Sequence, residues 1–104
     1  MLFRSMSYMF YRAYTLNRSA IHPIGNWNTS NVTNMSWMFH GVAYDIDVSN
    51  WDVSNVTNMT GMFSDTLRFN QDISSWDTSN VTNMSTMFQN AISFNQPLNS
   101  SILL

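Results

Sequence analysis

The chain has 104 residues, of which 44% are hydrophobic and only 10% are charged, so it has room for a single domain over residues 1–104. Its net charge of −2 and its four scattered arginines exclude a nucleic-acid-binding surface, which needs a basic face. Because it has no cysteine, a disulfide scaffold and a thiolate metal site are excluded as well, and no stretch is apolar for long enough to span a membrane.

The segment 1–26 resembles a degraded copy of a repeat that is clearer later in the chain. The word Met6-Ser7-Tyr8-Met9-Phe10 matches Met84-Ser85-Thr86-Met87-Phe88 in composition and spacing. Ser19-Ala20-Ile21-His22 then reads as a four-residue insertion before the first regular copy. No signal peptide is recognisable at the start, since polar residues interrupt the apolar stretch after Phe3.

Three regular copies follow, and a tryptophan opens each of them. Trp27, Trp51 and Trp76 are almost evenly spaced, and the first interval is shorter than the second by a single residue. The copies therefore cover residues 27–50, 51–75 and 76–100, and a tail remains at 101–104. A unit of this length cannot bury its own apolar face, so we expect the copies to stack on one another.

Each copy divides into a predicted strand and a predicted helix. From Val81 onward the apolar residues are spaced by 3, 3, 1, 3 and 3, which places them on one face at the helical period. Helix propensity is poor in the first half, so we expect a tight turn or a piece of 3₁₀ helix over 81–84 and a short helix over 85–91. Residues 72–77 are the best strand candidate. The pattern predicts an α/β solenoid of short parallel strands and short helices with about 3.5 coils.

The apolar repeat positions are expected to form the core of the stack. They are Trp27, Val32, Met35, Met38, Phe39, Trp51, Val56, Met59, Met62, Phe63, Ile73, Trp76, Val81, Met84, Met87, Phe88, Ala91 and Phe94. Trp37 differs, because it occupies the outward-facing slot of Gly61 and Thr86. It is either an exposed anchor for a partner or a ring covered by the N-terminal segment.

The repeated words resemble a known family. The words of the copy that begins at Trp51 are similar to the BspA-type leucine-rich repeat of bacterial and mycoplasmal surface proteins. These words are Trp51-Asp52-Val53-Ser54-Asn55-Val56-Thr57-Asn58-Met59, then Met62-Phe63, and then the run from Phe69 to Trp76. The resemblance covers residues 6–100. It implies a right-handed, leucine-rich-repeat-like coil at the cell surface or outside the cell, acting in adhesion and in binding host or matrix proteins. It supplies no catalytic motif.

Asparagines and aspartates recur at fixed positions of the repeat, and each set has two possible roles. Nine asparagines match the glycosylation sequon: Asn17, Asn28, Asn31, Asn34, Asn55, Asn58, Asn80, Asn83 and Asn99. One reading is glycosylation, and the favoured one is a ladder of asparagines that bond the backbone of turns. The aspartate columns, 52 with 77 and 47 with 72, are either calcium ligands or turn-capping residues, and capping is favoured because no acidic cluster is dense.

No constellation predicts an enzyme, a metal site or a cofactor. His22 and His40 lie outside the repeat pattern, without cysteine or an acidic cluster nearby, and no serine sits in a nucleophile motif. The first hypothesis is therefore a non-enzymatic module for protein–protein interaction or adhesion. The alternative is a structural spacer that self-associates through open coil ends, and a weaker one is ice or glycan binding by the Thr, Ser and Asn rows.

Overall fold

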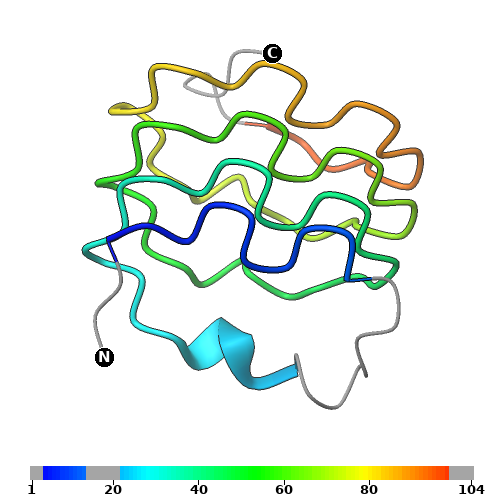
Figure 1. Cartoon of the computed structure of the whole chain (residues 1–104), viewed down its shortest axis with the longest axis horizontal. Coiled ribbons are helices and arrows are strands. Elements are labelled where there is room, and N and C mark those ends of the chain that lie inside the picture. Colours follow the sequence, from blue (N-terminus) through cyan, green and yellow to red (C-terminus); the bar gives the residue numbers. More distant parts are fainter. Residues whose placement is uncertain (1–3, 14–21, 99–104) are drawn as a thin grey trace.

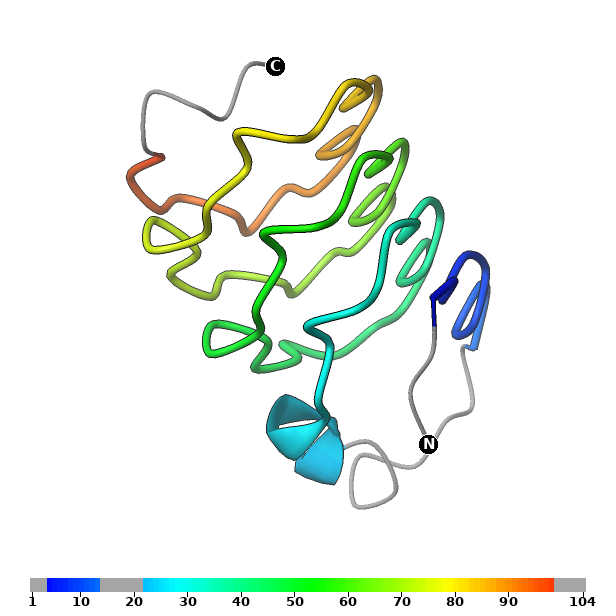
Figure 2. The same cartoon turned by 90° about the vertical axis from the view of Figure 1, so that its left-hand side faces the viewer.

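The computed structural model describes residues 4–13 and 22–98. The expected tail at 101–104, most of the expected insertion, and the sequons at Asn17 and Asn99 lie outside the described residues. Within them, the repeat copies form layers that stack side by side, as Figure 1 shows face-on and Figure 2 in profile. We number them layer 1 (residues 4–13), layer 2 (27–50), layer 3 (51–75) and layer 4 (76–98). The 3₁₀ helix η1 (His22–Asn26) leads into layer 2.

One side of every layer is a continuous run of tight turns, which we call the turn ladder. It covers residues 5–13, 34–42, 58–66 and 83–91, the wavy segments that run parallel in Figure 1. In layer 2, every second N–H bonds back within the layer: Met38 to Met35, His40 to Trp37, and Val42 to Phe39. The intervening N–H groups, of Met35, Trp37, Phe39 and Gly41, bond to carbonyl oxygens of layer 3. The backbone is satisfied by strict alternation between local and inter-layer bonds.

This alternation depends on backbone conformation. Trp37 and Gly41 have φ of 58° and 75°, in the left-handed region, and the same slots are left-handed in the other layers. A left-handed residue at every fourth position closes one turn. The N–H groups that follow it then point alternately to its own layer and to the neighbouring one. The result is a ribbon of turns that is neither a helix nor a strand.

The predicted solenoid of strands and helices is therefore wrong, including its leucine-rich-repeat-like form. Ser85–Ala91, predicted as a helix, is a run of turns ending at residue 90, and residues 72–77 form no strand. The described residues contain one short 3₁₀ helix and isolated parallel bridges that link Ser5, Asn34, Asn58 and Asn83 in successive layers. A helix would use every N–H internally, whereas here half of them hold the neighbouring layer.

A column of stacked phenylalanines runs through the core beneath the turn ladder. The rings of Phe10, Phe39, Phe63 and Phe88 follow one another with centroids 5.6, 5.8 and 5.7 Å apart and interplanar angles of 5°, 7° and 11°. Phe69 stacks on Phe63 in the same layer with centroids 3.9 Å apart, and on Phe94 of layer 4 at 5.7 Å, which forms a second, shorter column. Burying one such side chain contributes about 1.5–3 kcal/mol. No single layer has enough of them, which is why the layers depend on each other.

The tryptophans join the layers by a polar contact as well as by packing. Trp51 donates its indole Nε1–H to the carbonyl oxygen of Ile24 at 2.9 Å, and Trp76 donates in the same way to Val48 at 3.2 Å. The Trp51 and Trp76 rings pack against Phe39 and Phe63 with centroids 5.8 and 6.1 Å apart. Each indole therefore fills the core and satisfies a buried donor.

The expected core residues fall into three groups in the structure. Buried are Val32, Met35, Met38, Phe39, Trp51, Val56, Met59, Met62, Phe63, Ile73, Trp76, Met87 and Ala91. Val81, Met84, Phe88 and Phe94 of layer 4 are partly buried and packed against that core. Trp27 is 37% exposed, next to Phe10. The structure also buries residues that the repeat pattern did not single out, among them Val42, Val48 and Val53.

Candidate functional site

The outer surface of the turn ladder carries a group of aromatic side chains near its N-terminal end. Tyr8 and Trp37 occupy the same left-handed slot in layers 1 and 2, and their rings stack with centroids 6.5 Å apart at 24°. On its other side the Trp37 indole lies against Gly61, where an added Cβ would approach the ring carbons to 2.3 Å. Trp37 is thus half-buried between the layers on either side of it, so the covered reading describes it better than the exposed one.

A second column of side chains completes the group. Tyr11 stacks on the imidazole of His40 with centroids 4.8 Å apart at 19°, and Trp37 meets His40 edge-on at 5.5 Å. The rings of Tyr8 and Tyr11 pack together with centroids 5.2 Å apart. The Arg12 guanidinium lies 5.2 Å from the Tyr11 ring centre. We call Tyr8, Tyr11, Trp37 and His40 the aromatic cluster. Tyr8 remains 54% exposed, so the cluster presents ring surface to solvent.

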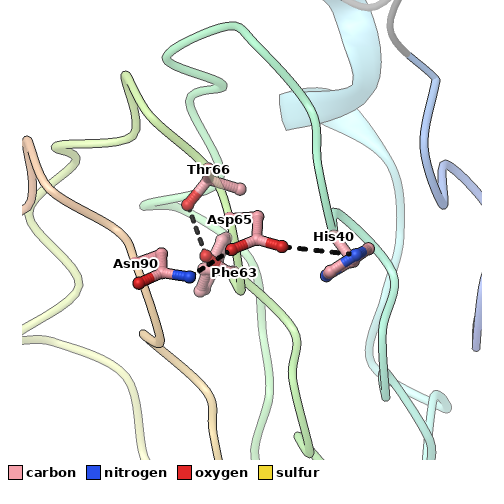
Figure 3. Close-up of polar contacts among 5 residues, drawn as sticks. All are labelled: His40, Phe63, Asp65, Thr66 and Asn90. Carbon is pink, nitrogen blue, oxygen red and sulfur yellow. Dashed lines mark hydrogen bonds and ion pairs between the residues drawn. The ribbon is translucent and has the colours of Figure 1, made fainter.

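His40 connects the aromatic cluster to a polar chain across three layers (Figure 3). Its Nε2 lies 3.7 Å from Oδ2 of Asp65, and Oδ1 of Asp65 accepts a hydrogen bond from Nδ2 of Asn90 at 2.8 Å. The other imidazole nitrogen, Nδ1, is buried and has no hydrogen-bond partner among the described residues. The Asp65 carboxylate therefore lies near Nε2 without a hydrogen bond to it, and the ring is packed by the stacked Tyr11 and the edge-on Trp37.

The sequence analysis missed most of this site. Tyr8, Tyr11, Arg12 and Asp65 were not singled out, and His40 was set aside as a poor metal ligand. A signal for Tyr8 was present, because the match of Met6–Phe10 to Met84–Phe88 already places Tyr8 in the slot of Trp37. The contacts of His40 with Asp65 join different layers, and a repeat alignment does not show them.

Two hollows lie elsewhere on the described surface. The larger, about 570 Å³, is lined by Ala43, Tyr44, Asp45, Arg68 and Ser93. Two of its polar side chains are used between layers, since Asp45 Oδ1 accepts the Asn70 N–H at 2.7 Å and Ser93 Oγ donates to the Leu67 carbonyl at 2.6 Å. The smaller, about 320 Å³, lies beside Arg4, Asn31, Thr33 and Asn55. We regard both as gaps between side chains of neighbouring layers.

The aspartates of the two repeat columns, at 47, 52, 72 and 77, close turns. Oδ1 of Asp52 accepts both the N–H and the hydroxyl of Ser54, at 2.9 and 2.6 Å, and Asp77 bonds Ser79 in the same way. The side-chain hydrogen bond from Ser54, and then its backbone N–H, lower the pKa of Asp52. Equivalent bonds from Ser74 and Ser79 lower the pKa of Asp72 and of Asp77. Within the described ranges no three His or acidic residues gather where a metal ion would fit.

The asparagine sequons also serve turns. Asn34, Asn58 and Asn83 each accept the N–H and the hydroxyl of the residue two positions later, which confirms the turn interpretation for this column. Asn55 and Asn80 instead donate from Nδ2 to carbonyl oxygens of the preceding layer, at 2.6 and 2.7 Å. The repeated asparagines are therefore used by the fold itself.

The threonine row is likewise engaged within the stack. Thr57 donates its N–H and its hydroxyl to the carbonyl of Thr33, at 2.8 and 3.1 Å, and Thr82 donates both to Thr57. A hydroxyl that donates to a neighbouring carbonyl has no proton left for a ligand. This arrangement disfavours the expected ice- or glycan-binding role of the row.

Comparison with known protein families gives a match over most of the chain. The family model described as "Mycoplasma protein of unknown function, DUF285" matches residues 4–102. No curated protein and no solved structure matches the chain. Among the described residues, no helix is both long and apolar enough to cross a membrane.

Proposed function

The chain belongs to this DUF285 family of mycoplasma proteins of unknown function, and we propose that it is a non-enzymatic module that binds another protein through the aromatic cluster. The observation that carries the proposal is the exposed stack of Tyr8 and Tyr11 on Trp37 and His40. Tyr, Trp and Arg are the residues that dominate binding energy at protein interfaces. The aromatic cluster supplies tyrosine and tryptophan, and the neighbouring Arg12 lies over the Tyr11 ring.

The rings are also held in place before any partner arrives. Tyr8 stacks on Trp37, Tyr11 stacks on His40, and Oδ2 of Asp65 lies 3.7 Å from Nε2 of that imidazole. Ordering a free side chain at an interface costs about 0.5–1.5 kcal/mol. Rings that are already stacked avoid most of that cost, so this surface is better suited to binding than the isolated exposed side chains of Leu67 and Ile92.

We further propose that binding takes place at the cell surface or outside the cell, and that the partner is a host or matrix protein. The support is the similarity of the Trp51–Met59 word to BspA-type surface repeats. The partner surface would carry a carboxylate for Arg12 and flat apolar groups for the two tyrosines. Adhesion is the biological role that such a module would serve.

Binding of the purified chain to immobilised matrix proteins tests the proposal. Tyr8→Ala/Tyr11→Ala is expected to weaken binding about 30-fold, because losing a hot-spot pair costs about 2 kcal/mol and 1.4 kcal/mol corresponds to a tenfold change. The matched control is Leu67→Ala/Ile92→Ala, which also removes two exposed apolar side chains. Equal losses in both variants, or no binding to any matrix protein, would contradict the proposal.

A further inference from the structure

The inter-layer bonds of the turn ladder have a direction. In this row each layer donates backbone N–H groups to carbonyl oxygens of the next layer along the chain, whereas the threonine bonds beside it, such as Thr57 N–H to the Thr33 carbonyl, run the opposite way. Between layers 2 and 3 the bonds run from Met35, Trp37, Phe39 and Gly41 to Asn58, Thr60, Met62 and Ser64. Between layers 3 and 4 they run from Met59, Gly61, Phe63 and Asp65 to Asn83, Ser85, Met87 and Gln89.

Layer 4 presents the donor half of this pattern. The counterparts of the donating residues are Met84, Thr86, Phe88 and Asn90. Among the described residues, their backbone N–H groups have no hydrogen-bond partner. They are spaced two residues apart, as at the interior junctions, so layer 4 offers a row of N–H groups along the axis of the stack.

Layer 1 presents the acceptor half. The counterparts of the accepting residues are Ser5, Ser7, Met9 and Tyr11. Their carbonyl oxygens accept no hydrogen bond from any described residue. Donors and acceptors at the two ends therefore agree in number, spacing and direction.

The apolar surfaces at the two ends are also incomplete. Val81, Met84, Phe88 and Phe94 are only partly buried, whereas their counterparts Val56, Met59, Phe63 and Phe69 in layer 3 are at most 1% exposed. In layer 1, Met9 is 36% exposed, against 0% for Met38. Covering this surface would complete the phenylalanine column, with Phe10 of one copy on Phe88 of another.

We propose that two copies of this chain associate head to tail, with layer 1 of one copy seated on layer 4 of the other. The junction repeats the interior one: Met84, Thr86, Phe88 and Asn90 donate to Ser5, Ser7, Met9 and Tyr11 of the second copy. Thr86 fits this arrangement because it is short. In the same slot, the large ring of Trp37 requires glycine in the layer that follows, whereas Thr86 leaves room for Tyr8.

The direction of the bonds excludes the symmetric alternatives. Two donor rows of the turn ladder facing each other, or two acceptor rows, cannot form these four hydrogen bonds. The contact is therefore heterologous, and repeated use of it extends the stack into a chain of copies. This inference is argued from backbone atoms along the stack axis and not from the protein-binding proposal. The junction would nevertheless bring Thr86 of one copy beside Tyr8 of the other, so it would cover part of the aromatic cluster.

Sedimentation of the full chain over a range of concentrations is the first test, with average mass expected to rise with concentration. Two blocked variants then define the contact. Met9→Asp blocks the acceptor end, and Ser85→Asp/Gln89→Asp blocks the donor end with two exposed side chains whose counterparts Ser36 and Ser64 are buried. Burying an unpaired carboxylate in the junction is strongly unfavourable.

Each blocked variant alone is expected to be a monomer, while an equimolar mixture forms a one-to-one dimer through the one intact junction. A blocked variant that still dimerises alone, or a mixture that stays monomeric, overturns the proposal. The matched control Asn50→Asp/Ser75→Asp adds two charges at exposed positions away from both ends and is expected to assemble like the unmodified chain. Circular dichroism verifies that all variants fold.

Amide hydrogen exchange gives a measurement that needs no variant. Exchange at Thr86, Phe88 and Asn90 is expected to slow as concentration rises, while Gly61, which is already bonded to Ser85, stays unchanged. If these three amides exchange equally fast at every concentration, the junction does not form. If they are already protected at the lowest concentration, they are paired within one chain, and self-association is overturned in favour of an intramolecular cap.

Discussion

The indole ring of Trp37 packs against the main chain of Gly61 in the next layer so closely that a Cβ at residue 61 would lie 2.3 Å from ring carbon Cε3. Backbone conformation alone does not explain the glycine. Tyr8, Trp37 and Thr86 adopt the same left-handed conformation in their own layers, with φ between 55° and 61°. The ring, rather than the φ angle, is what requires residue 61 to be glycine.

Gly61→Ala is therefore expected to destabilise the protein by about 2–5 kcal/mol, combining a left-handed penalty of about 1–2 kcal/mol with an overpacking cost of about 1–3 kcal/mol. Urea denaturation measures the loss. In a Trp37→Thr background the clash is absent, and the same substitution should cost only the left-handed penalty. An equal cost in both backgrounds would show that the ring contact has no energetic consequence.

Asn58 tests the turn role of the sequon column. Its Oδ1 accepts the Thr60 N–H at 2.9 Å and the Thr60 hydroxyl at 2.7 Å. Asn58→Asp keeps this oxygen and removes the sequon, so it should be close to neutral in stability. Asn58→Ala leaves the partly buried Thr60 donors unpaired and should cost about 1–3 kcal/mol. Thermal melts compare the two, with the exposed Asn50→Ala as control; similar losses for Asp and Ala would argue against the turn role.

Acid stability follows from the aspartates that close turns. Serine hydroxyls and N–H groups lower the pKa of Asp52, Asp72 and Asp77 in the folded chain. A lowered folded pKa adds stability above the unfolded value of about 3.9, and that stability is lost as pH falls through the folded pKa. Melting temperature should therefore drop below about pH 4.

Replacing the three aspartates by asparagine should flatten this acid decline, because an amide oxygen accepts the same bonds without titrating. Asn28 already does so for Ser30, with Oδ1 accepting its N–H at 3.1 Å. Ser54→Ala/Ser74→Ala/Ser79→Ala should also weaken the decline, since it removes the hydroxyls that are the largest cause of the lowered pKa values. Melting curves from neutral to acidic pH measure both effects, and an unchanged decline in both variants would rule out this origin.

The phenylalanine column should be most sensitive at its centre. Phe63 is fully buried and contacts the rings of Phe39, Phe69, Trp76 and Phe88. Phe63→Ala is expected to cost about 3–5 kcal/mol, a large share of the roughly 5–15 kcal/mol typical of a small domain. Phe10→Ala, in the partly buried first layer, should cost clearly less. Chemical denaturation of both variants tests the gradient, and equal losses would contradict it.

The candidate site shows how far repeat alignment reaches. The repeat pattern predicted that Trp37 is unusual for its slot. The match of Met6–Phe10 to Met84–Phe88 contained the signal for Tyr8 in the same column, although Tyr8 was not singled out. The stacking of His40 on Tyr11 and its approach to Asp65 could not be read from the repeat, because each contact joins residues of different layers. Such contacts depend on the spacing and direction of the layers, which single-chain periodicity does not encode.

The sequence alone determined the repeat, the nearly constant interval between its tryptophans, the apolar positions of the core and the pairing of Asn or Asp with a Ser or Thr two positions later. Only the tertiary structure decided between a helix and a ladder of turns. Steps of three between apolar residues suit both, since both bond a residue to one three or four positions away. The choice depended on the intervening N–H groups, such as that of Phe63, which find a better acceptor in Met87 of the next layer than in their own.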